Sequence, residues 1–357
     1  MKICHIITTI EYGGAEKQLL ILCKNQVRDA VDVHVIFVKG NPQLFHDFEA
    51  LGITIHDFTQ LEFINQVKRA RKLLLFESFK LIHAHLPRAE ILARLVIKKE
   101  KLVISRHNSE PFYPRVPRYF SWLLSNYVIK KCDALVCISH SVKSYLEEIG
   151  EIVCARKVYV VHYGLDFGSE RIPQKRKNTR RKSLRLVAIG RLEKQKDYPT
   201  LIQGLSLFSS EKLPFTIDIF GVGQLEQSLN ELVHMHNLQG HVRWRGKIEE
   251  IEEEMRKFDV MIHASIYEGF GMIYLEASKA GLPVLTSRND AAVEIFGSYY
   301  PGFFTTGDSL DLASKLIELT ENDFLELLQA EQESIRYRFD EASMWKSMKI
   351  VYSDVLT

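Results

Sequence analysis

Residues 259–287, DVMIHASIYEGFGMIYLEASKAGLPVLTS, contain two strand patterns separated by one helix pattern. The stretch begins with the apolar run DVMIHA, turns at Gly269 and Gly271, and continues with apolar residues at helical spacing. Gly281 followed by Pro283 is a typical helix stop, and PVLTS is again strand-like. A strand, a helix and a second strand in this order predict a β-α-β unit, in which the two strands lie parallel in one sheet.

The same alternation runs through both halves of the chain. Further strand-like runs are KICHII, VDVHVIFV, ITIHDF, LIHAH, LVISRH, ALVCIS, VYVVHYG, LRLVAIG, FTIDIF and HVRWRG. They predict an α/β protein of two Rossmann-like, doubly wound domains at residues 1–165 and 184–340, joined by a basic linker at 166–183. We expect a C-terminal helix at 341–357 to pack back on the N-terminal domain. Because ligands of such sheets bind beyond the carboxyl ends of the strands, the two domains should face a central cleft.

The composition is that of a soluble globular protein. The chain has 357 residues, of which 46% are hydrophobic and 26% charged, a length that fits two domains. It has no apolar run of the 18 or more residues that a membrane-spanning helix needs, and the N-terminus lacks a signal-peptide pattern. Its five cysteines are scattered without a C-x-x-C pair, so we expect reduced thiols, no zinc site and a cytoplasmic protein.

The charge is distributed unevenly between the two halves. Residues 1–183 contain 30 basic and 18 acidic residues, a net charge of +12, whereas the remainder contains 17 and 27, a net charge of −10. Such a division suggests that the N-terminal domain meets an anionic surface, which could be lipid headgroups, a phosphorylated acceptor or nucleic acid. The alternative is a basic face that is simply solvated.

Two glutamates flank the glycine turn of the opening stretch. Gly271 should lie at a helix N-terminus, where N–H groups and the helix dipole favour an anion such as phosphate. Glu268 and Glu276 would be separated by about 12 Å if both were helical, which is wider than the roughly 5–9.5 Å of a glycosidase carboxylate pair. They therefore suit different parts of one elongated ligand, such as a nucleotide sugar. Alternatively, Glu268 is only a helix N-terminal acid and Glu276 a surface residue.

Other turns carry cations or glycines after a strand. In AIGRLEKQKDYPTL, residues 188–201, Gly190 follows a strand, and Arg191 and Lys196 precede a helix. Cations at this position suit a diphosphate, although isolated surface cations are more often just solvated. Gly14 opens a helix directly after the first strand, without a full G-x-G-x-x-G pattern. The run FGVGQLE has two glycines, which alone are a weak phosphate signal.

Taken together, these segments resemble the retaining glycosyltransferases of family 4, which have the GT-B fold. The motifs that carry the resemblance are GGAEKQLL, IHAHLPRAE, CISHSVKSYL, GRLEKQKDYPTLI, GVGQLEQSL and YEGFGMIYLEASKAGLPVLTS. The similarity runs in order through most of the chain. Its most specific part is the G-R-x4-K pattern followed by E-x7-E.

The resemblance implies a role for each matched residue. Glu268 would contact hydroxyls of the donor sugar, and Glu276 would bind the ribose. Arg191 and Lys196 would hold the diphosphate, and His107 would lie near the donor sugar and the acceptor. His83 and His85 are expected to be scaffold, because a lone histidine at a strand end is usually structural. The implied catalytic residues are His107, Arg191, Lys196 and Glu268, and the implied donor-binding residues are Gly14, Gly190, Arg191, Lys196, Lys247, Glu268, Gly269, Phe270, Gly271, Met272, Ile273 and Glu276. One departure is Tyr163-Gly164, where the family usually has Asn-Gly before the linker.

The resemblance also implies a mechanism and partners. The chain has no D-x-D motif, so we expect a metal-independent enzyme without a cofactor that uses a nucleotide sugar, by family frequency a UDP-sugar. An acceptor hydroxyl would attack the anomeric carbon at the front face, with the departing phosphate as base. The acceptor would be a glycan or a lipid-linked intermediate of a bacterial surface polysaccharide.

An aromatic and basic stretch at residues 106–131 favours peripheral contact with an anionic membrane. It contains Phe112, Tyr113, Tyr119, Phe120 and Trp122 among Arg115, Arg118, Lys130 and Lys131, a mixture that suits a headgroup surface. The alternative is that these aromatics are core residues of an amphipathic helix.

Two other functions remain open from the sequence. A nucleotide-sugar 2-epimerase shares the fold, but the G-R-x4-K and E-x7-E patterns favour transfer. A non-catalytic nucleic-acid-binding protein would explain the basic half, but no nucleic-acid motif is visible, so no nucleic-acid partner is expected.

Overall fold

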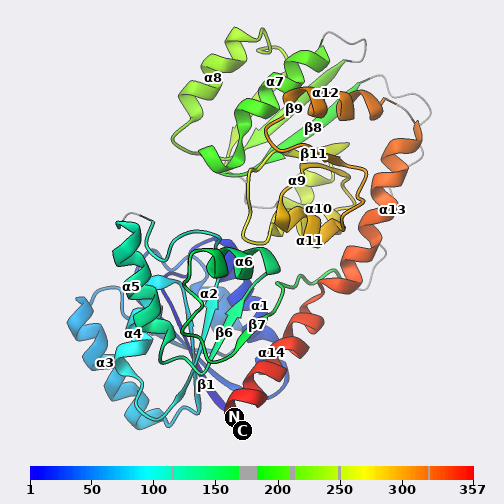
Figure 1. The fold of residues 1–357 in the computed structure, drawn as a ribbon. Coiled ribbons are helices and arrows are strands. Elements are labelled where there is room, and N and C mark those ends of the chain that lie inside the picture. The colour runs from blue at the N-terminus through cyan, green and yellow to red at the C-terminus, as the bar shows by residue number, and fades with distance from the viewer. Residues whose placement is uncertain (115, 169–182, 210–213, 248–250, 321) are drawn as a thin grey trace. The chain divides into compact units, whose positions relative to one another are not determined.

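The computed structural model describes residues 1–114, 116–168, 183–209, 214–247, 251–320 and 322–357. The chain divides into two compact units (Figure 1), an N-terminal unit of Met1–Asp166 with Phe339–Thr357 and a C-terminal unit of Phe167–Arg338. Most of the basic linker expected at 166–183, and Arg115 of the aromatic and basic stretch, lie outside the described residues.

The N-terminal unit contains a parallel sheet in the strand order β3-β2-β1-β4-β5-β6-β7. Its strands are β1 (Lys2–Ile7), β2 (Asp32–Phe37), β3 (Thr54–Asp57), β4 (Leu81–His85), β5 (Lys101–Arg106), β6 (Ala134–Cys137) and β7 (Val158–Val160). Its helices are α1 (Gly14–Arg28), α2 (Phe45–Ala50), α3 (Phe63–Glu77), α4 (Pro87–Val96), α5 (Arg118–Ile129), α6 (His140–Glu148) and α14 (Glu341–Leu356). The strand order reverses between β1 and β4, which creates a topological switch point.

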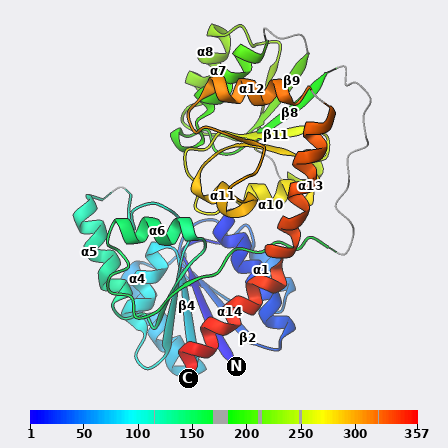
Figure 2. The same ribbon diagram turned by 45° about the vertical axis from the view of Figure 1, so that its right-hand side comes forward.

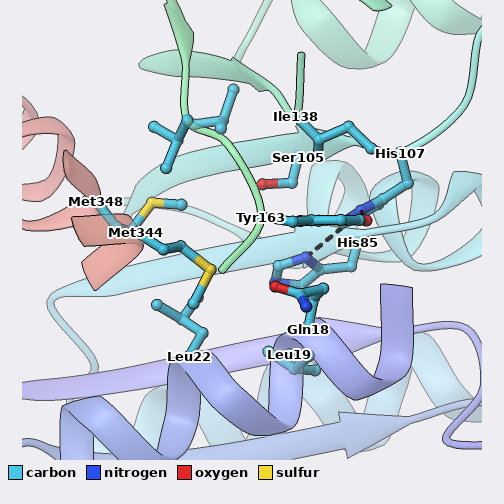
Figure 3. A pocket seen from close by; sticks show the side chains of 12 residues that line it. Gln18, Leu19, Leu22, His85, Ser105, His107, Ile138, Tyr163, Met344 and Met348 are labelled. Atoms are coloured by element: carbon cyan, nitrogen blue, oxygen red, sulfur yellow. Dashed lines mark hydrogen bonds between the residues drawn. The ribbon is translucent and has the colours of Figure 1, made fainter. Parts of the chain in front are cut away.

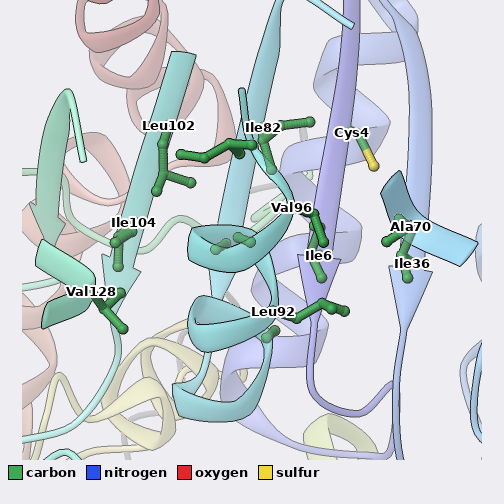
Figure 4. Close-up of a cluster of buried hydrophobic side chains, with 14 of the residues drawn as sticks. Cys4, Ile6, Ile36, Ala70, Ile82, Leu92, Val96, Leu102, Ile104 and Val128 are labelled. Atoms are coloured by element: carbon green, nitrogen blue, oxygen red, sulfur yellow. The ribbon is translucent and has the colours of Figure 1, made fainter. Parts of the chain in front are cut away.

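Both faces of this sheet are covered by helices. On one face, Cys4 and Ile6 of β1 pack with Ala70 of α3 and Leu92 of α4 (Figure 4). On the other face, strand residues that include Ile3 pack with α1 and with the C-terminal helix α14, which lies beside α1 (Figure 2). The alternation of the strand side chains explains this division, because successive residues point to opposite faces.

The C-terminal unit contains a second parallel sheet in the order β10-β9-β8-β11-β12-β13. Its strands are β8 (Leu184–Ile189), β9 (Phe215–Phe220), β10 (Val242–Gly246), β11 (Val260–His263), β12 (Val284–Ser287) and β13 (Phe303–Phe304). Its helices are the 3-10 turn η1 (Lys194–Lys196), α7 (Tyr198–Ser209), α8 (Glu226–Met235), α9 (Ile251–Met255), α10 (Met272–Lys279), α11 (Asp290–Phe296), α12 (Ser309–Glu318) and α13 (Asn322–Arg338).

The stretch at residues 259–287 forms β11, α10 and β12, with Met261 paired in parallel to Val284. The prediction of an α/β protein with two doubly wound parallel sheets is confirmed. In the C-terminal sheet the strand order reverses between β8 and β11, so the ends of these two strands mark its switch point. Within the described parts of the chain, no helix is both long and apolar enough to cross a membrane.

Candidate functional site

The switch point of the C-terminal sheet carries a buried ion pair. Lys196, at the end of η1, places its Nζ 2.5 Å from Oε1 of Glu268, which follows β11. The two residues are 72 positions apart in sequence. His263, the last residue of β11, places its Nε2 2.8 Å from the same carboxylate oxygen. The ends of β8 and β11 thus bring a cation, a carboxylate and an imidazole to one point.

The surroundings keep Glu268 ionised. Burial alone would raise the pKa of Glu268, but the ammonium of Lys196 and the hydrogen bond from His263 hold this pKa well below its ordinary value. Burial and the charge of Lys196 lower the pKa of His263, so the imidazole is neutral at pH 7. At neutral pH the carboxylate of Glu268 can therefore only accept hydrogen bonds.

Two further hydrogen bonds lock η1 onto the loop that carries Glu268. Gln195 donates its side-chain amide to the carbonyl of Tyr267 at 2.8 Å. In return, the backbone N–H of Ile266 donates to the carbonyl of Gln195 at 2.9 Å. Lys196 and Glu268 are thus also positioned by contacts between the residues that precede each of them, and their contact does not depend on their own side chains alone.

Glycines around this site serve close backbone packing. A Cβ on Gly190 would lie 3.2 Å from Cε of Lys196, so the aliphatic stem of the lysine passes directly over the backbone at this position. A Cβ on Gly221 would collide with the carbonyl oxygen of Gly190, and one on Gly223 with that of Leu192. The two glycines of FGVGQLE therefore have a structural role beside the turn that follows β8.

The helix start expected at Gly271 is confirmed. Gly271 is the N-cap of α10 in a left-handed conformation (φ 87°), and a Cβ there would collide with the ring of Tyr274. Glu276 lies inside α10, whereas Glu268 precedes the helix. The two glutamates are therefore not both helical, and the condition for the 12 Å separation is not met. Around the helix start, Phe270 is buried and Met272 and Ile273 are half-buried.

Two of the expected donor-binding cations lie apart from the ion pair. Arg191 is exposed and pairs with the carboxylate of Glu193 at 3.0 Å. Lys247 is exposed directly after β10, a strand separated from β8 by β9. The structure therefore brings together Gly190, Lys196 and Glu268, with Gly269 next in the chain. Arg191 and Lys247 are exposed in the turns that follow β8 and β10 of the same sheet.

The residues expected in the N-terminal unit lie at the carboxyl ends of its central strands. Gly14 is the first residue of α1, and among the described residues a Cβ on it would meet no atom within 4 Å. His107 directly follows β5 and places Nε2 3.2 Å from Nδ1 of His85, while its Nδ1 is hydrogen-bonded to the hydroxyl of Tyr163. His85, His107 and Tyr163 help to line a cavity of about 30 Å³ (Figure 3).

A group of three histidines in this unit has a spacing that a metal could use. One ring nitrogen from each of His5, His83 and His85 lies within 4.8 Å of those from the other two. However, His83 already contacts the hydroxyls of Tyr352 and Ser105, and His5 contacts His85 at 3.1 Å and the amide of Gln26 at 2.9 Å. Because each of these nitrogens has a hydrogen-bonding partner, the cluster fits a hydrogen-bonded network better than a metal centre.

Sequence reasoning missed several residues that shape these sites. His263 was not singled out, although its position at a strand end just before the glycine turn was a usable signal. Gln195 had no signal, because its contact with Tyr267 depends on which strands are neighbours. Tyr163 was noted only as a departure from the family pattern, and its contact with His107 now gives it a partner.

Comparison with known proteins identifies the family. The model described as Glycosyltransferase Family 4 matches residues 12–168, and the model described as Glycosyl transferases group 1 matches residues 170–337. EpsD of Bacillus subtilis (strain 168), which carries a provisional glycosyltransferase name, is 26% identical over 351 residues, covering 90% of this chain and 89% of that protein. N-acetyl-alpha-D-glucosaminyl L-malate synthase of Bacillus anthracis is 25% identical over 244 residues, covering 65% and 62%.

Solved structures share the fold. Anabaena Alr3699/HepE, in complex with UDP-glucose, superposes with a TM-score of 0.82 at 19% identity, covering 99% of both chains. The lipopolysaccharide outer core galactosyltransferase WaaB, in its apo form, gives 0.75 at 16% identity and also covers 99% of both chains. The chain therefore belongs to the family-4 type of glycosyltransferases with the GT-B fold.

Proposed function

We propose that this glycosyltransferase moves a hexose-type sugar from a UDP-sugar to a hydroxyl of a glycan or lipid-linked acceptor, with retained stereochemistry and without a metal ion. The observation that carries the proposal is the buried Lys196–Glu268 pair backed by His263 at the switch point of the C-terminal sheet. The UDP-glucose complex of HepE, which has the same fold, supports the donor class. The name of WaaB, a lipopolysaccharide galactosyltransferase, supports a role in bacterial surface polysaccharide synthesis.

The donor would lie along the edge formed by the turns after β8, β10 and β11. Glu268 accepts hydrogen bonds from sugar hydroxyls, and the backbone N–H groups at residues 270–273 face the sugar and the phosphates at the start of α10. Glu276 binds the ribose, and the backbone of residues 245–247 faces the base. Gly14 of the N-terminal unit leaves room for the donor, and His107 lies near the sugar and the acceptor.

Lys196 and Arg191 supply the positive charge that the diphosphate requires. An ammonium has three N–H donors, so the contact of Lys196 with Glu268 leaves others that can reach a phosphate oxygen. Among the described residues, exposed Arg191 pairs with Glu193 on the same turn, so a diphosphate can compete for its guanidinium at small cost. Both cations also stabilise the negative charge that develops on the phosphate as it leaves.

The reaction that we propose is a front-face displacement. The acceptor oxygen forms a bond to the anomeric carbon on the face from which the diphosphate departs. The bond between that carbon and the phosphate oxygen breaks, its electron pair stays on the phosphate, and the acceptor proton moves to the same phosphate. Isolation of a covalent glycosyl-enzyme adduct would contradict this front-face displacement.

A thermal-shift panel of nucleotide sugars tests the donor class directly. A ligand that binds only the folded state stabilises the protein by about 2.7 kcal/mol at a concentration of 100 Kd. We expect UDP-sugars to raise the unfolding temperature clearly more than GDP- or ADP-sugars. If no UDP-sugar raises it at millimolar concentration, the proposed donor is wrong.

The acceptor side carries an unusual helix. In α5, Ser121 and Ser125 are fully buried, whereas Tyr119 and Phe120 are 66% and 56% exposed. The large apolar side chains exposed along this one helix are Tyr119, Phe120, Trp122, Leu123, Leu124 and Tyr127. Exposed apolar surface of this kind marks an interaction site. Phe112, by contrast, is a core residue at 2% exposure, and Tyr113 is half-buried against the same core cluster, so the core alternative is correct for Phe112 and in part for Tyr113.

We propose that this face of α5 rests on an anionic membrane, where a lipid-linked acceptor would be found. Arg118, Lys130 and Lys131 are exposed on or next to the same helix, and cations beside aromatic side chains suit anionic headgroups. Co-sedimentation with vesicles of phosphatidylglycerol and phosphatidylcholine tests this contact. We expect salt-sensitive binding that the double variant Tyr119→Ser, Phe120→Ser abolishes.

Helix α3 provides a matched control for the vesicle experiment. Its Leu75 and Phe76 are 66% and 74% exposed, so replacing both by serine removes a similar apolar area from another helix of the same unit. This control should bind vesicles as the wild type does. Equal binding by all three proteins, or no binding by the wild type, contradicts the membrane contact.

A further inference from the structure

A continuous line of hydrogen bonds runs from Tyr163 into the core of the N-terminal unit. The hydroxyl of Tyr163 contacts Nδ1 of His107, and Nε2 of His107 lies 3.2 Å from Nδ1 of His85. Nε2 of His85 lies 3.1 Å from Nδ1 of His5, and Nε2 of His5 lies 2.9 Å from Oε1 of Gln26. These five residues, named the relay below, come from three adjacent strand segments, from α1 and from the segment after β7.

The direction of every bond in the relay follows from its inner end. Oε1 of Gln26 can only accept, so Nε2 of His5 carries a hydrogen. The other amide atom of Gln26, Nε2, donates to the hydroxyl of Tyr352 at 3.3 Å. A neutral imidazole with a hydrogen on Nε2 accepts at Nδ1. His85 must therefore donate from Nε2 to His5, and His107 must donate from Nε2 to His85.

The hydroxyl of Tyr163 supplies the outer end of the relay. Because Nδ1 of His107 is an acceptor in this arrangement, the hydroxyl of Tyr163 is the donor. The same polarity continues beyond Gln26. The hydroxyl of Tyr352 donates to Nδ1 of His83 at 2.7 Å, and Nε2 of His83 lies 2.8 Å from the hydroxyl of Ser105. All four histidines are therefore assigned the same tautomer, with hydrogen on Nε2.

The histidines remain neutral at physiological pH. A protonated imidazole has no acceptor nitrogen. The contacts between the rings therefore require neutral histidines, each with one donor nitrogen and one acceptor nitrogen. Burial lowers the pKa of His5 to about 4 and that of His107 to about 3. Burial and neighbouring rings lower the pKa of His83 and His85 well below the ordinary value. Burial also raises the pKa of Tyr163, so its hydroxyl keeps its proton.

The relay does not conduct protons. It ends on the amide of Gln26, which has no proton to exchange at neutral pH, so a proton that entered at Tyr163 would have no exit. Both ring nitrogens of His107 are engaged, one by Tyr163 and one by His85. His107 is thus fixed in ring orientation and tautomer, and it is not available as a general base.

We propose that Tyr163 and Gln26 are positioning residues, which act through this one-way relay to fix the tautomer and orientation of His107 for sugar transfer. The inference rests on the proposed placement of His107 near the donor sugar and the acceptor. It also explains the tyrosine before Gly164: the hydroxyl of Tyr163 supplies the donor that Nδ1 of His107 requires. With His107 held in this state, the acceptor proton must go elsewhere, and the departing phosphate takes it.

Nitrogen NMR of the full chain tests the relay without any assay of transfer. We expect ¹⁵N–¹H correlation spectra to show His107, His85 and His5 as neutral Nε2–H tautomers at pH 7 and at pH 5.5, with His107 assigned from a His107→Gln sample. In Tyr163→Phe, the Nδ1 resonance of His107 should shift. In Gln26→Leu, His5 should lose its single tautomer. A hydrogen on Nδ1 of His107 in the wild type, or titration of His107 near pH 6.5, overturns the proposal.

The kinetic arm separates positioning from binding. Tyr163→Phe should lower kcat by about tenfold, the scale of one lost hydrogen bond, with the KM for the UDP-sugar within about twofold. Tyr159→Phe is the matched control, because its hydroxyl contacts Asp354 instead of a histidine, and it should leave kcat and the His107 resonances unchanged. Unchanged kcat in Tyr163→Phe overturns the positioning role. If the wild type transfers no sugar but shows the expected tautomers, the proposed function fails and the relay stands.

Discussion

At the scale of single residues, Lys196 and Glu268 form one unit of the site. From the sequence, Lys196 was expected to hold the diphosphate and Glu268 the sugar. The structure joins them in an ion pair at 2.5 Å, with side chains that are 15% and 11% exposed. Because breaking a buried pair leaves an uncompensated charge, the two residues should affect stability as well as donor binding.

Replacing Glu268 separates these two effects. Glu268→Ala should destabilise the C-terminal unit by about 3 kcal/mol, because the ammonium of Lys196 loses its partner in a buried site. Glu268→Gln keeps the shape of the side chain and should lower the free energy of unfolding by less than Glu268→Ala does. Both variants should lose sugar transfer. The exposed pair of Arg191 and Glu193 is the control, and Glu193→Ala should change stability by less than about 1 kcal/mol. Urea unfolding measures all three, and equal stability of Glu268→Ala and the wild type contradicts the role of the pair.

Gly14 has no packing reason to be a glycine within its own unit. A Cβ there would meet no described atom within 4 Å, and Gly14 begins α1, where alanine is the better helix former by up to about 1 kcal/mol. Gly14→Ala should therefore keep or raise the unfolding midpoint while lowering kcat/KM on the order of tenfold to hundredfold through misplacement of the donor. Full activity would show that this space is not needed for the donor.

Residues with a local motif could be predicted from the sequence, and residues with only a spatial partner could not. Gly271 was placed correctly at a helix start, because a strand, a glycine and a helix pattern follow one another in the chain. Gln195 gave no such signal, because its contact with Tyr267 depends on β8 lying beside β11. His263 had one in its position at a strand end just before the glycine turn. The roles assigned from the resemblance to Arg191, Lys247 and Glu276 stay predictions.

At the scale of elements, periodicity predicted most of the strands and the alternation with helices, but it missed β13 and did not give the strand order in the sheets. The reversal between β8 and β11, which gathers the Lys196–Glu268 pair, appears only once the strand order is known. The two glycines of FGVGQLE illustrate the same limit. Their spacing suggested a weak phosphate loop, whereas the fold uses them to let the turn after β9 pack against the turn after β8.

The packing of Gly221 gives a test at this scale. Gly221→Ala would force a Cβ onto the carbonyl of Gly190 in a backbone conformation of φ 150°, so we expect a loss of about 1–3 kcal/mol from overpacking and weaker UDP binding. Gly240→Ala is the matched control, because a Cβ there meets no described atom within 4 Å. Urea unfolding midpoints of the two variants test this packing role. Equal midpoints would contradict it.

Helix α5 shows why a helical pattern alone does not identify the buried face. A pattern rich in aromatic residues would ordinarily direct them inward, yet the serines of α5 face the interior. The hydroxyl of Ser125 donates to Glu151 at 2.6 Å and accepts from Arg106 at 2.9 Å, and that of Ser121 accepts from the backbone N–H of Tyr113 at 2.8 Å. A buried charged cluster therefore fixes the orientation of the helix and leaves its aromatic side chains outside.

At the scale of the whole molecule, the chain returns to its starting unit. Leu165 and Phe339 are joined by a backbone hydrogen bond, and α14 then packs against α1. Gly164 permits this return, because a Cβ there would lie 2.6 Å from the carbonyl oxygen of Asp340. Through Tyr352, α14 also reaches the end of the relay at Gln26. A contact of this kind joins the first and last segments of the chain, and no local pattern could predict it.

The buried histidines predict a strong dependence of stability on acid. The folded chain keeps His5, His83, His85 and His107 neutral because their pKa values are lowered, whereas the unfolded chain takes up protons below about pH 6.5. Stability should therefore fall as the pH drops from 6.5. Glu90 opposes this trend, because burial raises its pKa to about 7, so the folded chain holds one extra proton.

The lowered pKa values of His34, His56 and His263 act in the same direction as those of the four relay and core histidines. Each proton that the unfolded chain binds in excess adds about 1.4 kcal/mol per pH unit to the slope. Thermal unfolding of the wild type at pH 7.5, 6.5, 5.5 and 5.0 measures this dependence, and the steepest fall of the midpoint should lie below pH 6.5. A midpoint that stays constant down to pH 5 would show that the histidines are protonated in the folded chain as well.

The central claim is that the switch point of the C-terminal sheet binds the diphosphate of a UDP-sugar through Lys196, and calorimetric titration with UDP tests it most directly. The control is Lys194, an exposed lysine on the same turn. Loss of one charge-assisted hydrogen bond should weaken the Kd of Lys196→Met by about tenfold to hundredfold, whereas Lys194→Met should stay within about twofold of the wild type. Equal Kd values for Lys196→Met, Lys194→Met and the wild type would contradict the account.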